Sequence, residues 1–193
     1  MNDLLPLLGF VFFGLFSPGP NVILLTTSGA RFGFRRTVPH IVGVALGVGI
    51  TAAVTGYGVG TVLSALPNIA FGLKIVASLW IIWMAVQLWR ADPTVARDRA
   101  KPFTMVEAIL FQWVNPKVWA VAMSATAYIV EMPPNAQAAL LGLTFSSINL
   151  GVCLFWTAAG SMLALLLTNP LAWQVFMRVM AVALAGFSLL VFL

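Results

Sequence analysis

Apolar residues fill six long stretches of the chain, and short polar or proline-containing segments separate them. The stretches run over about residues 4–29, 39–63, 69–89, 104–130, 136–166 and 173–193. Crossing the hydrocarbon core of a bilayer takes roughly 20 helical residues, and each stretch is near or above that length. The pattern therefore predicts an all-α, polytopic membrane protein with six transmembrane helices in a single domain, residues 1–193.

The composition also indicates a lipid environment. Of the 193 residues, 61% are hydrophobic and 8% are charged, whereas soluble domains carry about 25% charged residues. A soluble domain of this size exposes too much surface to hide so many apolar side chains. The formal net charge of +5 arises mostly in the gaps between apolar stretches. This placement indicates membrane-surface loops and argues against nucleic-acid binding, which needs a basic patch on a soluble face.

Basic residues gather on one side of the predicted topology. Those that follow the first, third and fifth stretches are Arg31, Arg35, Arg36, Arg90, Arg97, Arg99, Lys101 and Arg178. Because Lys- and Arg-rich loops stay in the cytoplasm, both termini are predicted to face out. Segment 91–102 then becomes a cytoplasmic linker between two repeats, residues 1–90 and 103–193. With three spans each, the second repeat enters the membrane inverted relative to the first, as in many secondary transporters.

Two stretches contain proline where an unbroken helix would exclude it. These motifs are Ser17, Pro18, Gly19, Pro20 and Asn21 in the first stretch and Asn115, Pro116 and Lys117 in the fourth. Each offers a capping residue and then a proline suited to the first helical position, Ser17 before Pro18 and Asn115 before Pro116. Helices one and four are therefore predicted to be broken near the middle of the membrane.

A helix that restarts inside the membrane presents free amide groups and a positive dipole end. Lys117 adds a full positive charge beside the second break. The two breaks are therefore predicted to form a substrate-binding site for an anionic group such as a carboxylate. The alternative is that the prolines only kink packed helices, which is common in membrane proteins.

The segments "SPGPNVILLTTSGARFGFRR" and "FTMVEAILFQWVNPKVWAV" resemble the lysine-exporter superfamily of bacterial amino-acid exporters (the LysE/RhtB type). That family carries a Pro-Gly-Pro motif in the first span, often followed by asparagine, and an Asn-Pro-Lys motif in the fourth. The resemblance covers essentially the whole chain. It implies export of amino acids from the cytoplasm across the bacterial inner membrane, coupled to the proton gradient. Span three reads "ASLWIIW" where the family often has Gly-x-x-Tyr-Leu, a difference that bears on substrate size.

Two stripes of small or polar residues recur at four-residue spacing. Gly43, Gly47, Thr51 and Thr55 form one in the second stretch, and Asn149, Cys153, Thr157 and Ser161 form the other in the fifth. The first stripe is predicted to be a face for close helix packing. The second either lines the transport cavity, with Asn149 as a substrate ligand, or seals a helix contact.

Glu107 and His40 are candidates for proton coupling or gating. Ionisable residues inside a membrane are functional candidates by default, and an imidazole titrates near neutral pH. The alternatives are that Glu107 pairs with a nearby Arg or Lys and that His40 is solvated at the membrane interface.

Three functions compete. An intramembrane enzyme would need a nucleophile beside a base, paired carboxylates or a metal cluster, and one His, one Cys and peripheral acidic residues cannot supply these at depth. A non-transporting membrane subunit would tolerate replacement of the Asn-Pro-Lys motif.

The sequence predicts a secondary exporter of amino acids or small carboxylates. Its partners are the amino acid and the bilayer, no cofactor or metal is expected, and homo-oligomerisation is left open. Neutral or apolar amino acids are favoured, because no mid-membrane Asp or Glu is available for a cationic side chain.

The orientation can be tested by cysteine labelling in a Cys153→Ser background. A membrane-impermeant maleimide added to intact cells should react with Met132→Cys and not with Arg97→Cys, since the positive-inside rule places residue 97 in the cytoplasm. Labelling of both positions after permeabilisation is the control. Reaction at residue 97 in intact cells would reverse the orientation.

Overall fold

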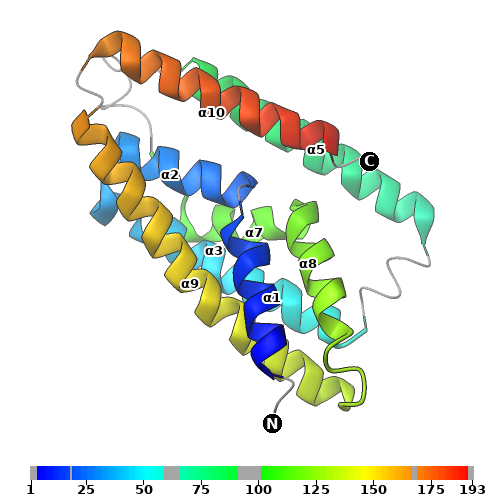
Figure 1. The fold of residues 1–193 in the computed structure, drawn as a ribbon. Helices are drawn as coiled ribbons and strands as arrows, with labels where there is room; N and C mark the ends of the chain where they lie inside the picture. The colour runs from blue at the N-terminus through cyan, green and yellow to red at the C-terminus, as the bar shows by residue number, and fades with distance from the viewer. Residues whose placement is uncertain (1–3, 18, 59–65, 91–100, 167–168, 191–193) are drawn as a thin grey trace.

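The computed structural model describes residues 4–17, 19–58, 66–90, 101–166 and 169–190, and these form helices and no strands (Figure 1). The helices are α1 (Leu4–Phe16), α2 (Pro20–Phe32), α3 (Phe34–Gly56), α5 (Pro67–Trp89), α7 (Met105–Val114), α8 (Pro116–Thr126), α9 (Pro134–Leu166) and α10 (Pro170–Leu190). The all-α prediction is therefore confirmed for the described residues. Pro18 and most of the predicted linker, residues 91–100, lie outside them.

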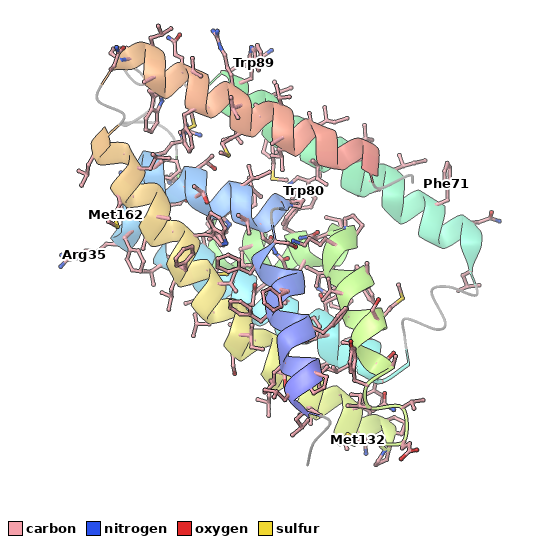
Figure 2. All side chains as sticks on the ribbon, viewed as in Figure 1. Arg35, Phe71, Trp80, Trp89, Met132 and Met162 are labelled. Carbon is pink, nitrogen blue, oxygen red and sulfur yellow. The ribbon has the colours of Figure 1, made fainter. Side chains whose placement is uncertain are left out.

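Two of the described helices, α3 and α9, are long and apolar enough to cross a bilayer. The pair α1 and α2 would add a third span, bent by 56° between its halves. Large apolar side chains also cover the outer surface, with Leu5, Leu143 and Leu165 each more than 70% exposed, and many such side chains point outward in Figure 2. An apolar surface of this extent suits contact with lipid. The count of six spans stays a prediction.

The helices that contain the two proline motifs end and restart. Helix α1 ends at Phe16 and α2 begins at Pro20, while α7 ends at Val114 and α8 begins at Pro116. The predicted cap of α8 is confirmed, because the Asn115 side chain accepts a hydrogen bond from the backbone amide of Lys117 at 3.2 Å. Proline at the first helical position loses nothing by lacking an amide proton.

The predicted cap of the first restart is wrong. Gly19, with extended backbone, precedes the first residue of α2. Ser17 belongs to the end of α1 instead, where its hydroxyl donates to the carbonyl of Gly14 at 3.0 Å. The helix restarts at the second proline of the motif, so Ser17 bonds backward as serine does within a helical turn.

The gap between the first two predicted spans, residues 30–38, contains less loop than the pattern predicts. Arg31 lies in the last turn of α2, whereas Arg35 and Arg36 already belong to α3. Only Gly33 separates the two helices, with φ of 79°. This left-handed conformation is accessible to glycine at little cost, so a one-residue turn suffices.

Two apolar cores hold the helices together. In the first, α1, α3, α8 and α9 bury residues such as Val11, Val48, Ala122 and Phe145. In the second, α2 packs on α10 and shares an apolar cluster with α5, and α5 and α10 lie side by side in Figure 1. Helix α2 contributes to both cores, so the segment after the first break lies where the two cores meet.

The small residues of α3 let α7 approach closely. A Cβ atom on Gly43 would lie 2.7 Å from the Cβ of Ala108, and one on Gly47 would lie 2.7 Å from Cγ of Gln112. Thr55 completes the stripe and donates its hydroxyl to the carbonyl of Thr51 within the same helix, at 2.8 Å. The predicted packing face is therefore confirmed for its two glycines.

Helices α2 and α9 cross with their backbones in contact. A Cβ atom on Gly29 would overlap the backbone of Thr157, and one on Gly160 would overlap the backbone of Thr26. Both glycines are buried. At Thr157, the stripe of α9 therefore seals a helix contact, which is one of the two alternatives that the sequence left open.

Replacing Gly43 by Ala should lower the stability of the protein by about 1–3 kcal/mol, because the added methyl overpacks a contact in which the neighbouring atoms include backbone. Thermal unfolding in detergent micelles measures the change. The matched control is Gly151→Ala in α9, where a Cβ atom would meet nothing within 4 Å. Equal melting temperatures for the two variants would contradict the proposed close contact.

Candidate functional site

The two helix breaks meet through Lys117. Its ammonium group donates a hydrogen bond to the backbone carbonyl of Ser17, at the end of α1. The lysine side chain reaches this carbonyl by passing over Gly19, where a Cβ atom would lie 2.8 Å from Cδ of Lys117. The carbonyl end of a helix carries partial negative charge. Lys117, at the start of α8, thus stabilises the end of α1.

A pair of amide side chains makes the second connection between the breaks. Asn21 donates through Nδ2 to Oε1 of Gln112 at 2.8 Å, and Gln112 donates through Nε2 to Oδ1 of Asn21 at 3.2 Å. Asn115 also donates to Oε1 of Gln112, at 3.4 Å. Gln112 is fully buried, and Asn115 is 1% exposed. Gln112 therefore joins the residue after the first break to the residue at the second.

The sequence analysis missed Gln112. A signal was present, because Gln112 is the one amide in the apolar run "AILFQWV" that precedes Asn115. It stands three residues before Asn115, and residues at this spacing lie on the same face of a helix. Its Nε2 also donates to the carbonyl of Ala108 at 2.9 Å, which fixes the side chain along α7.

We call Ser17, Gly19, Asn21, Gln112, Asn115 and Lys117 the break cluster. It combines one ammonium group, three amide side chains and one helix-end carbonyl. Lys117 is half-buried and Ser17 is exposed, so the charged end of the cluster is accessible. Ammonium and amide groups donate to carboxylates, and amide and carbonyl oxygens accept from ammonium groups. The donors and acceptors of the break cluster thus match in kind the carboxylate and the ammonium group of a small zwitterion.

Three other candidates lie elsewhere. Asn149 is 2% exposed and its Nδ2 has no hydrogen-bond partner among the described residues, and no described hydrogen bond ties it to the break cluster. Glu107 closes a capping box at the start of α7, with its carboxylate accepting from the amide and the hydroxyl of Thr104, both at 2.8 Å. The proposed solvation of His40 is wrong, because the imidazole is 2% exposed and packs against the ring of Phe103, 5.1 Å between centroids.

Glu107 and His40 do share one space. A cavity of about 360 Å³ lies between α2, α3, α5, the segment before α7, and the start of α7 itself. We call it the vestibule. Its ionisable lining residues are Arg31, His40, Lys101 and Glu107, and its apolar wall includes Trp83 and Met84. The vestibule reaches Leu24 on α2, one helical turn from Asn21 of the break cluster.

Comparison with known proteins identifies the family. The model of the LysE type translocator family matches residues 12–193. The chain belongs to this family. The resemblance found in the two proline motifs is thereby confirmed, as is the assignment to transport. Members of this family are translocators and not enzymes.

Curated relatives of this LysE-family chain include named efflux proteins. The homoserine/homoserine lactone efflux protein of Salmonella typhimurium is 28% identical over 162 residues, 80% of this chain and 78% of the relative. The cysteine/O-acetylserine efflux protein of Klebsiella pneumoniae is 23% identical over 163 residues, 82% and 83% of the two chains. A membrane protein of Vibrio cholerae is 26% identical over 172 residues, 85% and 83%. No solved structure matches the chain.

Replacing Gln112 by Leu should destabilise the protein by about 1–3 kcal/mol, because the amide groups of Asn21 and Asn115 lose a buried partner. Thermal unfolding in detergent gives the value. The control is Gln137→Leu, which removes one exposed bond to the carbonyl of Met132. In the double variant Asn21→Leu with Gln112→Leu, the loss should be smaller than the sum of the single losses, and strict additivity would argue against the pairing.

Proposed function

We propose that the chain exports a small neutral amino acid, or a close derivative, from the bacterial cytoplasm across the inner membrane. The family match supports export, and the named relatives supply candidate substrates in homoserine, cysteine and O-acetylserine. The observation that carries the proposal is the hydrogen bond from Lys117 to the Ser17 carbonyl. It puts a positive group and a negative helix end together at the junction of two broken helices.

The substrate would bind by exchanging partners with the protein. Its carboxylate accepts from Lys117 and draws the ammonium group away from Ser17. Its own ammonium group then donates to the vacated Ser17 carbonyl, which as a helix end attracts positive charge. Gly19 leaves room for the Lys117 side chain, and Pro20 and Pro116 begin the helices that follow the breaks. Asn21, Gln112 and Asn115 offer amide groups to polar side-chain atoms of the substrate. Asn149 is proposed as a further ligand from α9.

Six spans arranged as two inverted repeats would place this site at the repeat interface, where secondary transporters bind substrate. Helix packing supports the arrangement. Helix α3 packs on both α7 and α8, and α9 packs on both α1 and α2. Helix α3 also packs on α9, and α5 packs on α10. If α1 and α2 correspond to α7 and α8, α3 to α9 and α5 to α10, exchange of the two halves converts the α3–α7 and α3–α8 contacts into the α9–α1 and α9–α2 contacts. The α3–α9 and α5–α10 contacts are unchanged by this exchange.

The proton gradient is the proposed energy source. His40 and Glu107, which line the same cavity, are the candidates for proton transfer or gating. Lipid surrounds the exposed apolar surface in this proposal, and assembly into homo-oligomers is compatible with it.

Replacing Lys117 by Met keeps the bulk of the side chain and removes its charge, so efflux should fall to background. Membrane insertion should be unaffected, because a charge at this depth costs insertion energy. Lys117→Arg should restore little, since a planar guanidinium group does not replace a compact ammonium group. Efflux of homoserine and of O-acetylserine from cells loaded with dipeptides provides the measurement, with membrane protein quantified in parallel.

Arg35→Met is the matched control, because Arg35 is exposed and lies away from the break cluster at the edge of the molecule (Figure 2). It should export at the parental rate. If Lys117→Met also exports at the parental rate with equal protein in the membrane, the break cluster is not the substrate site. The alternative of a non-transporting membrane subunit predicts instead that the wild type gives no efflux above background.

A further inference from the structure

The vestibule has the charge pattern of an amino-acid site, although the break cluster lies outside it. Arg31 and Lys101 bring positive charge from α2 and from the segment before α7, and Glu107 brings negative charge from α7. Trp83 and Met84 of α5 provide an apolar wall. The volume of about 360 Å³ lies within the range of about 300–1,000 Å³ that is typical of small-molecule sites.

A buried imidazole supplies a polar group for a ligand. His40 lines the vestibule and is 2% exposed, and its Nδ1 has no hydrogen-bond partner among the described residues. Buried polar atoms in native proteins nearly always have a partner. The imidazole is held in place by Phe103, which lines the same vestibule.

The charged groups of the vestibule are held by the fold and remain able to bind. Arg31 is half-buried and its guanidinium group lies over the ring of Phe32, 5.1 Å from the ring centroid. Glu107 is fixed by Thr104 through Oε2, and a carboxylate can accept several hydrogen bonds. Two opposite charges are thus positioned by different helices around one space.

We propose that the vestibule is a second amino-acid site, which binds the substrate as a zwitterion before it reaches the break cluster. The carboxylate binds Arg31 and Lys101, and the ammonium group binds Glu107. This inference rests on the proposed export function. From Arg31 to Asn21, α2 covers ten residues, or about 15 Å at the helical rise. The vestibule therefore lies at the end of α2 that carries the predicted cytoplasmic arginines, and α2 connects it to the break cluster.

Comparing homoserine with homoserine lactone tests the contacts to the carboxylate and to the ammonium group separately. Both compounds carry an ammonium group, and only homoserine carries a carboxylate. Uptake into inside-out vesicles gives KM for each compound. Arg31→Gln should raise KM for homoserine about tenfold and leave KM for the lactone within about twofold, as expected for loss of a charge-assisted contact to the carboxylate. Glu107→Gln should raise KM for both compounds. Glutamine preserves the capping box, so this variant removes charge without removing the cap.

Arg35→Gln is the matched control, since it removes an exposed arginine four residues further along the chain, in α3, that does not line the vestibule. Both KM values should stay unchanged in it. An equal rise of KM for homoserine and for the lactone in Arg31→Gln would overturn the assignment of Arg31 to the carboxylate.

Equilibrium binding of radiolabelled homoserine to purified protein separates this inference from the proposed function. Lys117→Met removes the charge of the break cluster, so this protein should keep only the vestibule site for homoserine. Adding Arg31→Gln or Glu107→Gln to Lys117→Met should then lower the remaining affinity about tenfold. Failure of the wild type to transport, with this binding pattern intact, would remove the export proposal and leave the vestibule. Absence of binding to the wild type, or binding that depends on Lys117 and not on Arg31, would overturn the vestibule.

A zwitterionic lipid head group shares the same charge pattern. Binding is therefore measured in nanodiscs of phosphatidylglycerol alone and of phosphatidylglycerol with phosphatidylethanolamine. Equal affinity for homoserine in the two supports the free amino acid as ligand. Competition by phosphatidylethanolamine that disappears in Glu107→Gln protein would assign the vestibule to lipid instead.

Discussion

Backbone groups freed by a helix break inside a membrane must find partners in the protein, and the rest of this structure depends on how that requirement is met. The carbonyl of Ser17, at the first break, is bound by Lys117 from the second. The side-chain amide of Asn21, after the first break, donates to Gln112 from the helix that leads to the second. The second break also has a local cap, since Asn115 accepts from the backbone amide of Lys117, whereas these two partners of the first break come from the other half of the chain.

Close packing makes this mutual satisfaction feasible. Gly47 of α3 leaves room for the side chain of Gln112, and Gly19 leaves room for that of Lys117. A larger side chain at either glycine would displace one of the two residues that connect the breaks. Glycines that look like generic features of membrane helices thus determine whether the polar groups of the site can meet.

Local signals in the sequence were enough to predict that the chain is helical, that Asn115 caps a helix, and that Gly43 and Gly47 lie on a packing face. Local sequence could not decide which proline begins α2, because Pro18 and Pro20 are equally suited to a first helical position. The capping box of Thr104 and Glu107 could have been predicted from the pattern Thr-x-x-Glu before an apolar run. His40 packs against Phe103, which is far away in the sequence, so no local pattern could predict that His40 is buried. The partnership of Asn21 with Gln112 is likewise a tertiary property.

The crossing of α2 and α9 constrains how such a molecule can move. The carbonyl of Thr157 in α9 faces Gly29 of α2, and the carbonyl of Thr26 in α2 faces Gly160 of α9, with no side chain in between that could change rotamer. Close-packed backbones of this kind shift as a rigid body or separate altogether. Helices α2 and α9 are therefore expected to move together, so that a rearrangement at the first break would change the position of α1 relative to this pair.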